Sequence, residues 1–226
     1  MTDRKNIAID GPSGAGKSTL ARMAAAHFGL IYVDTGAIYR SVGLAARRAG
    51  ISTKDEPGIA ALLPGLDIRL CHDGGGVQRM LLAGEDISEA IRLPEISLSA
   101  SEASALPVVR SFLLEMQRSL AREQDVVMDG RDIGTVVLPD AGLKIFLTAD
   151  VAERARRRFR ELSDKGVPTS LDEVLRDMQQ RDQNDTNRAE APLRAAEDAV
   201  RLDTTNLSLD ESFMALRRLI EERFGL

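Results

Sequence analysis

The sequence predicts an α/β protein with a five-stranded parallel sheet flanked by helices. Five short apolar runs, at residues 7–9, 30–33, 126–128, 143–147 and 200–202, alternate with helical segments. Parallel strands that are covered by helices on both faces have this continuous apolar character. A glycine-rich segment follows the first run directly, and an alternating apolar and polar stretch at 65–88 interrupts the order of strands and helices.

The glycine-rich segment at residues 11–19 fits the phosphate-loop pattern, Gly-x-x-x-x-Gly-Lys-Ser/Thr. Glycines let the backbone approach a phosphate, and the N–H groups at the start of the next helix converge on an anion. Lys17 supplies a charge for the β- and γ-phosphates, and the Ser18 hydroxyl can bind Mg²⁺. The alternative is a chance glycine turn, but the apolar run before it and the helix after it favour a nucleoside triphosphate site. Its expected contacts are Gly11, Ser13, Gly14, Ala15, Gly16, Lys17, Ser18 and Thr19.

Helices are expected between the strands. The first covers Lys17–Phe28 and has Gly29 as its C-terminal cap. A second ends near Ala49, a short one lies within residues 54–64, and a long one runs from Pro107 to about Gln124. Three more begin at capping signals, Asp150 with Glu153, Ser170 with Glu173, and Ser208 with Glu211; the last two end near Arg181 and Phe224.

Residues 65–88 are expected to form a small antiparallel insertion. Leu66, Ile68 and Leu70 alternate with polar residues, three glycines after Asp73 form a turn, and residues 77–83 return. A third short strand is expected near residues 86–88. The rest of the chain alternates strands with helices, so an antiparallel hairpin within it is best explained as an insertion.

Composition narrows the function. The net charge is -5 and aromatic residues make up only 4% of the 226 residues, which argues against a nucleic-acid-binding protein. No apolar run reaches the ~20 residues of a membrane span, and the first strand follows a polar N-terminus, so we expect neither a membrane segment nor a signal peptide. One cysteine, Cys71, and two histidines are too few for a disulfide or a zinc site. We expect a cytoplasmic monomer.

Asp129 ends the third apolar run. In many phosphate-loop proteins an acid at this place is linked to Mg²⁺. A strand-terminal aspartate that caps a turn explains the position equally well.

Five arginines lie within residues 154–160. On a helix Arg154, Arg157 and Arg158 share one face, and a mobile cationic lid would neutralise charge during phosphoryl transfer. The alternative is a solvated face on which Glu153 and Glu161 pair with these arginines.

A second cluster runs from Arg181 to Arg188. On a helix Arg181, Asp185 and Arg188 share a face. A surface ladder of ion pairs gives the same spacing, so the pattern alone leaves both explanations open.

Nearly the whole chain resembles bacterial cytidylate kinases, a family of nucleoside monophosphate kinases. The resemblance depends on Asp10 to Ser18 and on five further groups of segments. These are Asp-Thr-Gly-Ala-Ile-Tyr-Arg at 34–40, Gly-Glu-Asp-Ile-Ser at 84–88 with Ile91-Arg92, Asp-Gly-Arg-Asp-Ile-Gly-Thr-Val-Val at 129–137, Lys-Ile-Phe-Leu at 144–147, and 181–193 with Arg-Asp, Asn-Arg-Ala and Ala-Pro-Leu. The segments at 34–40 and 130–135 are much more specific than the phosphate loop.

The resemblance implies a P-loop kinase that uses ATP, Mg²⁺ and CMP or dCMP. It implies a core at about 1–36, 106–150 and 189–226, a monophosphate-binding region at about 37–105 that carries the insertion, and a lid at about 151–170. It also implies that Arg40, Arg131 and Arg188 hold the acceptor phosphate, Ser101, Arg110 and Asp132 hold cytosine, and Arg181 and Asp185 hold the sugar. Thr35, where the family more often has serine, and Tyr39 complete the acceptor site. Lys17, Arg131, Arg154 and Arg158 are the expected catalytic residues.

Cytosine chemistry fits this assignment, because Asp132 can accept from the N4 amino group and Arg110 can donate to N3 and O2. Uracil would mispair with both side chains, at about 1–3 kcal/mol each. The alternatives are a kinase for UMP or another metabolite, a small GTPase, and a non-catalytic nucleotide-binding relative. The chain has no Asn-Lys-x-Asp motif for guanine, and the intact Gly-Lys-Ser and the arginines argue against the last alternative.

Overall fold

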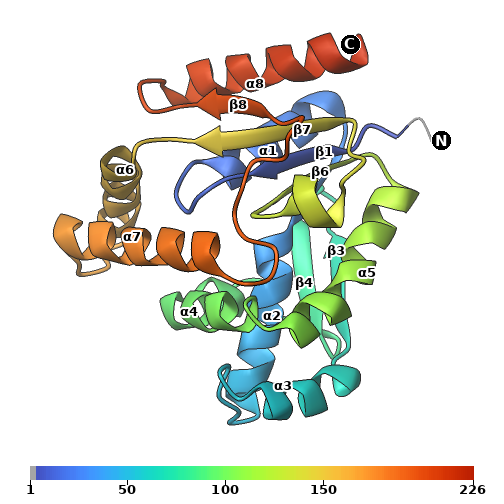
Figure 1. The fold of residues 1–226 in the computed structure, drawn as a ribbon, viewed down its shortest axis with the longest axis vertical. Coiled ribbons are helices and arrows are strands. Elements are labelled where there is room, and N and C mark those ends of the chain that lie inside the picture. The colour runs from blue at the N-terminus through green and yellow to red at the C-terminus, as the bar shows by residue number, and fades with distance from the viewer. Residues whose placement is uncertain (1–3) are drawn as a thin grey trace. The chain divides into compact units, whose positions relative to one another are not determined.

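The structure is a computed structural model that describes residues 4–226, so the first three residues of the expected core lie outside it (Figure 1). The chain divides into two compact units, one of Met1–Leu30 with Asp125–Leu226 and one of Ile31–Gln124. The expected division into core, acceptor region and lid stays a prediction.

The parallel sheet has five strands in the order β2-β6-β1-β7-β8, which confirms the expected fold class. Four of them belong to the first unit: β1 (Ile7–Asp10), β6 (Val126–Gly130), β7 (Leu143–Thr148) and β8 (Val200–Asp203). β1 is central, with Ile7 beside Val127 on one side and Leu143 on the other. All four residues of β1 are buried: Ile7, Ala8 and Ile9, as their apolar character predicts, and also Asp10.

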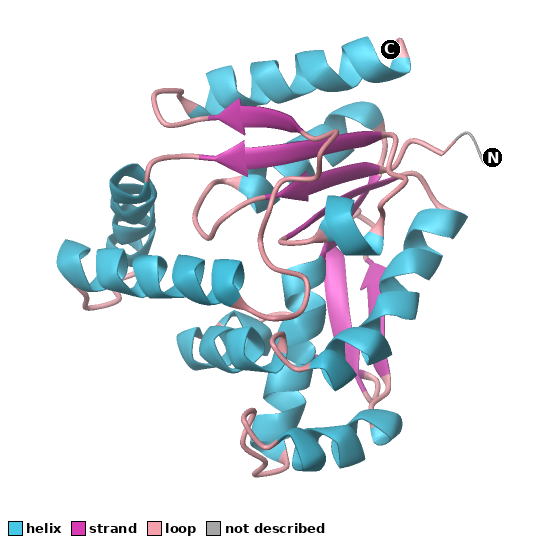
Figure 2. Cartoon of the chain, viewed as in Figure 1, coloured by secondary structure: helices cyan, strands magenta, loops and turns pink. Residues whose placement is uncertain are grey.

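The helices of the first unit are α1 (Lys17–Phe28), α6 (Val151–Asp164), α7 (Leu171–Asn187) and α8 (Leu209–Phe224). Gly29 ends α1 in the left-handed conformation, at φ 67°. Ser170 and Ser208 form reciprocal capping boxes with Glu173 and Glu211, as expected. α7 continues six residues past the expected end at Arg181, so the second charged cluster is helical as far as Asn187, and Arg188 is the C-cap of the helix. α8 lies along β8 at the end of the sheet (Figures 1 and 2).

A π-helical turn, Ile133–Val137, follows β6 and was not expected from the sequence. Asp132 precedes this turn, and Ile133, Gly134 and Val137 are buried. The turn has only five residues, too few for a helical pattern of apolar residues in the sequence. It depends instead on contacts with β1, which is far away in the sequence.

The second unit begins with β2 (Ile31–Asp34) and α2 (Thr35–Arg48), followed by α3 (Glu56–Leu62). The expected insertion is a three-stranded antiparallel sheet of β3 (Ile68–His72), β4 (Gln78–Leu82) and β5 (Glu85–Asp86). The hairpin lies alongside α2 in Figure 1, and Met80 and Leu82 of β4 enter the core that α2 shares with α5 (Pro107–Glu123).

α4 (Pro94–Ala103) is the helix of this unit that the sequence analysis missed. Its apolar face consists of Ile96, Ala100 and Ala103, which recur every three or four residues and are buried. The serines between them make the segment look polar, so this helical pattern was not recognised. α4 packs closely on α2, because a Cβ added at Gly43 would lie 3.1 Å from the Ala100 amide nitrogen. No helix among residues 4–226 is long and apolar enough to cross a membrane.

Candidate active site

The phosphate loop connects β1 to α1 and lies tightly against the neighbouring strand β7. A Cβ added at Gly11, which has φ 152°, would lie 1.9 Å from the Leu147 carbonyl oxygen. Gly14 and Gly16 also have positive φ, 72° and 90°. Gly16 immediately precedes α1 and has no side chain to cap the first helical amides, so these N–H groups remain for an anion.

Lys17 is buried against this loop, and its Nζ donates to the Pro12 carbonyl at 2.8 Å. Burial and the neighbouring Arg131 lower the pKa of Lys17 to about 7. A cation in this position lacks enough negative charge around it, and bound phosphates would supply that charge.

Ser18 and Asp129 fit a magnesium site. The Ser18 hydroxyl donates to Asp129 Oδ2 at 3.0 Å, and Asp129 is buried at the end of β6. Two protein oxygens are enough for Mg²⁺, which keeps several water ligands and takes phosphate oxygens as the others. This geometry favours the metal-linked explanation of Asp129 over a simple turn cap.

Arg154, on α6, reaches the phosphate loop. Its guanidinium donates to the Ser13 carbonyl at 2.8 Å, to the Ala149 carbonyl at 2.9 Å and to Asp182 Oδ2 at 2.7 Å. Only 6% of its side chain is exposed. It therefore ties both α6 and α7 to the loop.

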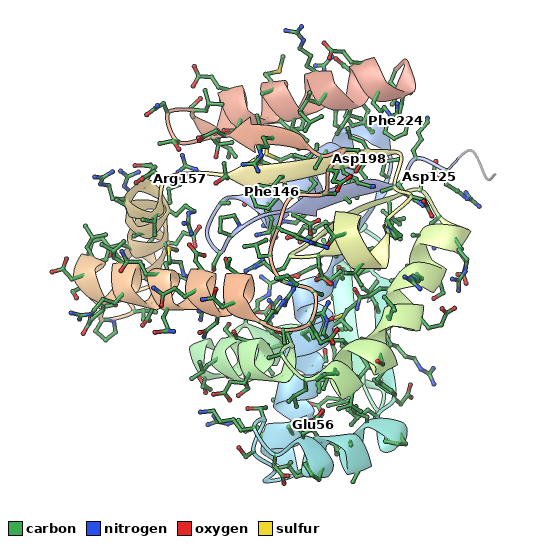
Figure 3. All side chains as sticks on the ribbon, viewed as in Figure 1. Glu56, Asp125, Phe146, Arg157, Asp198 and Phe224 are labelled. Carbon is green, nitrogen blue, oxygen red and sulfur yellow. The ribbon has the colours of Figure 1, made fainter. Side chains whose placement is uncertain are left out.

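The next three arginines of α6 follow the solvated-face alternative. Arg156 and Arg157 pair with Glu153, and Arg158 pairs with Glu161 at 2.9 Å. Arg157, labelled in Figure 3, also donates to the Thr204 carbonyl at 2.7 Å, which fixes α6 to the segment after β8. Arg154 and Arg158 thus differ: the first contacts the loop backbone, and the second pairs within its own helix.

The charged cluster on α7 pairs with the segment after β6 rather than with itself. Arg131 Nε donates to Asp185 Oδ2 at 2.7 Å, and Arg188 donates to Asp132 Oδ1 at 3.3 Å. The ladder explanation is therefore wrong for these pairs. Burial, followed by the charge of Arg158, lowers the pKa of Arg181. Four of the expected acceptor residues are thereby brought together, with Arg181 on the same helix.

Asp10 is a buried carboxylate that the sequence analysis did not select. Its Oδ1 accepts from the Ile133 amide at 2.8 Å and its Oδ2 from the Gly134 amide at 2.7 Å. Burial is the main reason that its pKa is raised to about 6. Asp10 holds the start of the π-helical turn directly after Asp132; its place just before Gly11 was the only signal in the sequence.

In the second unit, Asp34 and Arg40 are joined at the start of α2. Asp34 Oδ1 caps the helix by accepting from the Ala37 amide at 3.0 Å, and its Oδ2 accepts from Arg40 Nη2 at 2.7 Å. Gly36 leaves room for this pair, since a Cβ there would lie 2.9 Å from Arg40 Nη1. Thr35, the first residue of α2, is buried.

The remaining expected acceptor residues of this unit lie on α2, α4 and α5. The Arg110 guanidinium lies 5.7 Å from the centre of the Tyr39 ring, and Arg110 Nη1 donates to the Ser104 carbonyl at 3.3 Å. The Ser104 hydroxyl in turn donates to the Ser101 carbonyl at 2.9 Å. Tyr39, Ser101 and Arg110 are therefore linked within this unit.

A Gly-Lys-Ser loop after a central parallel strand, with a lysine and an arginine held against it, places the chain among the P-loop kinases. The family model described as cytidylate kinase matches residues 7–222. The cytidylate kinase of Geobacter sp. (strain M21) is 48% identical over 219 residues, which are 97% of this chain and 94% of the relative. That of Caldicellulosiruptor bescii is 49% identical over 216 residues, 96% of this chain and 94% of the relative. The chain belongs to the cytidylate kinase family.

A solved structure supports the fold alone. An uncharacterized protein from Eubacterium ventriosum ATCC 27560 has a TM-score of 0.54 and 13% sequence identity, over 97% of this chain and 100% of the other.

Proposed function

We propose that this protein phosphorylates CMP and dCMP with ATP as the donor, producing ADP and CDP or dCDP. The observation that carries the proposal is the 48% identity to a cytidylate kinase over 97% of the chain. The phosphate loop and the arginines around it lie within residues 7–222, which the family model matches. We further propose that the enzyme acts as a monomer in the cytoplasm.

The donor half of the proposed site is the loop from Gly11 to Thr19. Lys17 and the loop amides would hold the ATP phosphates, and Arg154 keeps the loop in shape through Ser13. Ser18 and Asp129 would hold Mg²⁺, which would neutralise negative charge on the ATP phosphates. Arg158 would reach the transferred phosphoryl group only after leaving Glu161.

Each unit carries residues that we assign to the acceptor. In this proposal Arg40, Arg131 and Arg188 bind the CMP phosphate, and Arg181 and Asp185 bind the sugar. Ser101, Arg110 and Asp132 bind cytosine, with Thr35 and Tyr39 beside them. In the structure Arg131 pairs with Asp185, and Arg188 pairs with Asp132. When CMP binds, these two arginines would interact with its phosphate as well as with their aspartates.

The chemistry needs no strong general base, because the acceptor phosphate is itself the nucleophile. This chain's own residues would act by holding the two phosphates in line and by neutralising charge on the transferred oxygens. Exclusion of water from the site would prevent hydrolysis of ATP.

A coupled assay with ATP and Mg²⁺ tests the proposal across CMP, dCMP, UMP and AMP. The expected order places CMP and dCMP far ahead of UMP, and Asp132→Ala or Arg110→Ala should raise KM for CMP much more than KM for ATP. Turnover of UMP at the CMP rate, or an unchanged CMP KM in both variants, would refute the base assignment. Lys17→Met should depress kcat, and near-normal turnover would exclude its role.

A further inference from the structure

The antiparallel insertion holds the end of β2 through one side chain, Gln78. This residue begins β4, and its Oε1 accepts from the Asp34 amide at 2.7 Å. Its Nε2 donates to the Asp34 carbonyl at 3.4 Å. The amide of one side chain therefore satisfies both backbone groups of Asp34, in the way that a neighbouring strand would.

A second residue of the same hairpin extends this contact. His72 lies opposite Gln78 in the β3–β4 register, and its Nε2 lies 2.9 Å from the Tyr32 carbonyl oxygen. Gln78 and His72 thus meet alternate residues of β2. Of these two side chains, Gln78 binds Asp34, the residue whose carboxylate contacts Arg40.

Asp34 is the connection between the hairpin and Arg40. With its backbone held by Gln78, its carboxylate accepts from the Ala37 amide and from Arg40 Nη2. Arg40 Nε is buried and, within the described part of the chain, has no hydrogen-bond partner. The guanidinium is therefore oriented by one oxygen of Asp34 and keeps a donor that an anion can use.

We propose that Gln78 is a positioning residue for the acceptor phosphate, and that this is what the insertion contributes to catalysis. Gln78 holds Asp34, Asp34 aims Arg40, and Arg40 meets the phosphate of the nucleoside monophosphate. The inference rests on the proposed function, because it assigns Arg40 to that phosphate. It predicts an effect on acceptor binding that the donor does not share.

Gln78→Met tests the inference, because methionine has a similar length and lacks both amide groups. We expect KM for CMP to rise about tenfold, which corresponds to about 1.4 kcal/mol and is in the range for a partly buried amide, that of Asp34, left without an acceptor. KM for ATP and kcat should change less than about twofold. Gln78→Glu, which keeps the acceptor and loses the donor, should give a smaller rise and serves if the methionine variant does not fold.

Arg79→Gln is the matched control. Arg79 is the next residue on β4, and it pairs with Asp73 at the hairpin turn instead of contacting β2. Its substitution should leave KM for CMP unchanged. In an Arg40→Lys background, Gln78→Met should add little to KM, because the two changes act through one contact.

The outcomes separate two failures. If the wild-type protein and Arg79→Gln phosphorylate CMP and Gln78→Met has the same CMP KM, the positioning role is refuted and the proposed function stands. An equal rise in Arg79→Gln, or full additivity with Arg40→Lys, also refutes it. Absence of CMP phosphorylation by the wild-type protein would overturn both.

Discussion

Replacement of Asp10 by asparagine should make a defined part of the pH dependence of stability disappear. Asp10 is buried, and each of its carboxylate oxygens accepts one backbone N–H. Burial raises its pKa from 3.8 to about 6 despite those two bonds. A raised pKa in the folded state means that the group's contribution is complete below pH 3.8 and is lost as the pH rises through 6.

The expected magnitude follows from these two pKa values. Between about pH 4.5 and about pH 7.5, the free energy of unfolding of the wild type should lose about 2 kcal/mol through this one carboxyl group. Asparagine cannot ionise, and its NH₂ meets a backbone N–H much as the O–H of the protonated Asp10 does at the lower pH. Asp10→Asn should therefore be nearly neutral at the lower pH and about 2 kcal/mol more stable than the wild type at the higher pH.

Urea denaturation of both proteins at several pH values in this range measures the difference directly. Asp198→Asn is the control, because Asp198 is exposed before β8 and the nearby Lys144 lowers its pKa (Figure 3). Its effect on stability should stay nearly constant over the same range. A pH-independent difference between wild type and Asp10→Asn would refute the assignment of a buried, proton-linked carboxyl group.

Three further changes test the proposed donor half of the site. Gly11→Ala should lower the free energy of unfolding by more than about 4 kcal/mol or prevent folding, because its Cβ would lie 1.9 Å from the Leu147 carbonyl oxygen. Gly65→Ala is the control, because a Cβ there would meet no atom within 4 Å. Equal urea midpoints for the two variants would contradict the prediction. Arg154→Ala should lower the free energy of unfolding by about 3 kcal/mol, since it leaves Asp182 without its buried partner. The double variant Arg154→Ala/Asp182→Asn should recover part of this loss. An unchanged urea midpoint in Arg154→Ala would contradict the prediction. Burial lowers the pKa of Lys17 to about 7, so Lys17 loses its charge above that pH and the MgATP dissociation constant should rise by up to about tenfold per pH unit. Lys17→Met should show no such dependence on pH. Calorimetry that finds no pH dependence in the wild type would refute the assigned role of the Lys17 charge.

The features that could be predicted from the sequence are encoded by residues close together in the chain. The phosphate loop, the Gly29 cap and the capping boxes at Ser170 and Ser208 each depend on a few neighbouring residues. The apolar runs identified all five strands, and alternation identified the insertion. These signals do not depend on which distant element packs beside them.

The missed features depend on contacts between distant parts of the chain. Asp10 acts on amides 123 and 124 residues away, and Gln78 acts on Asp34, 44 residues before it. No spacing rule connects such positions, so their roles appear only once the strands are arranged. The division of the arginine cluster has the same cause: Arg154 lies beside the loop carbonyls, whereas Arg158 pairs with Glu161 on its own helix.

The β1–β6 register has a consequence for how this chain can change in length. Asp10 pairs with Gly130, so Gly11 and Arg131 leave adjacent strands at the same level, about 4.8 Å apart. A single-residue deletion within β6 would move Arg131 into the ladder and turn its side chain to the opposite face. Insertions should be tolerated at residues 164–169, but the lengths of β1 and β6 are constrained by the pairing of these two strands.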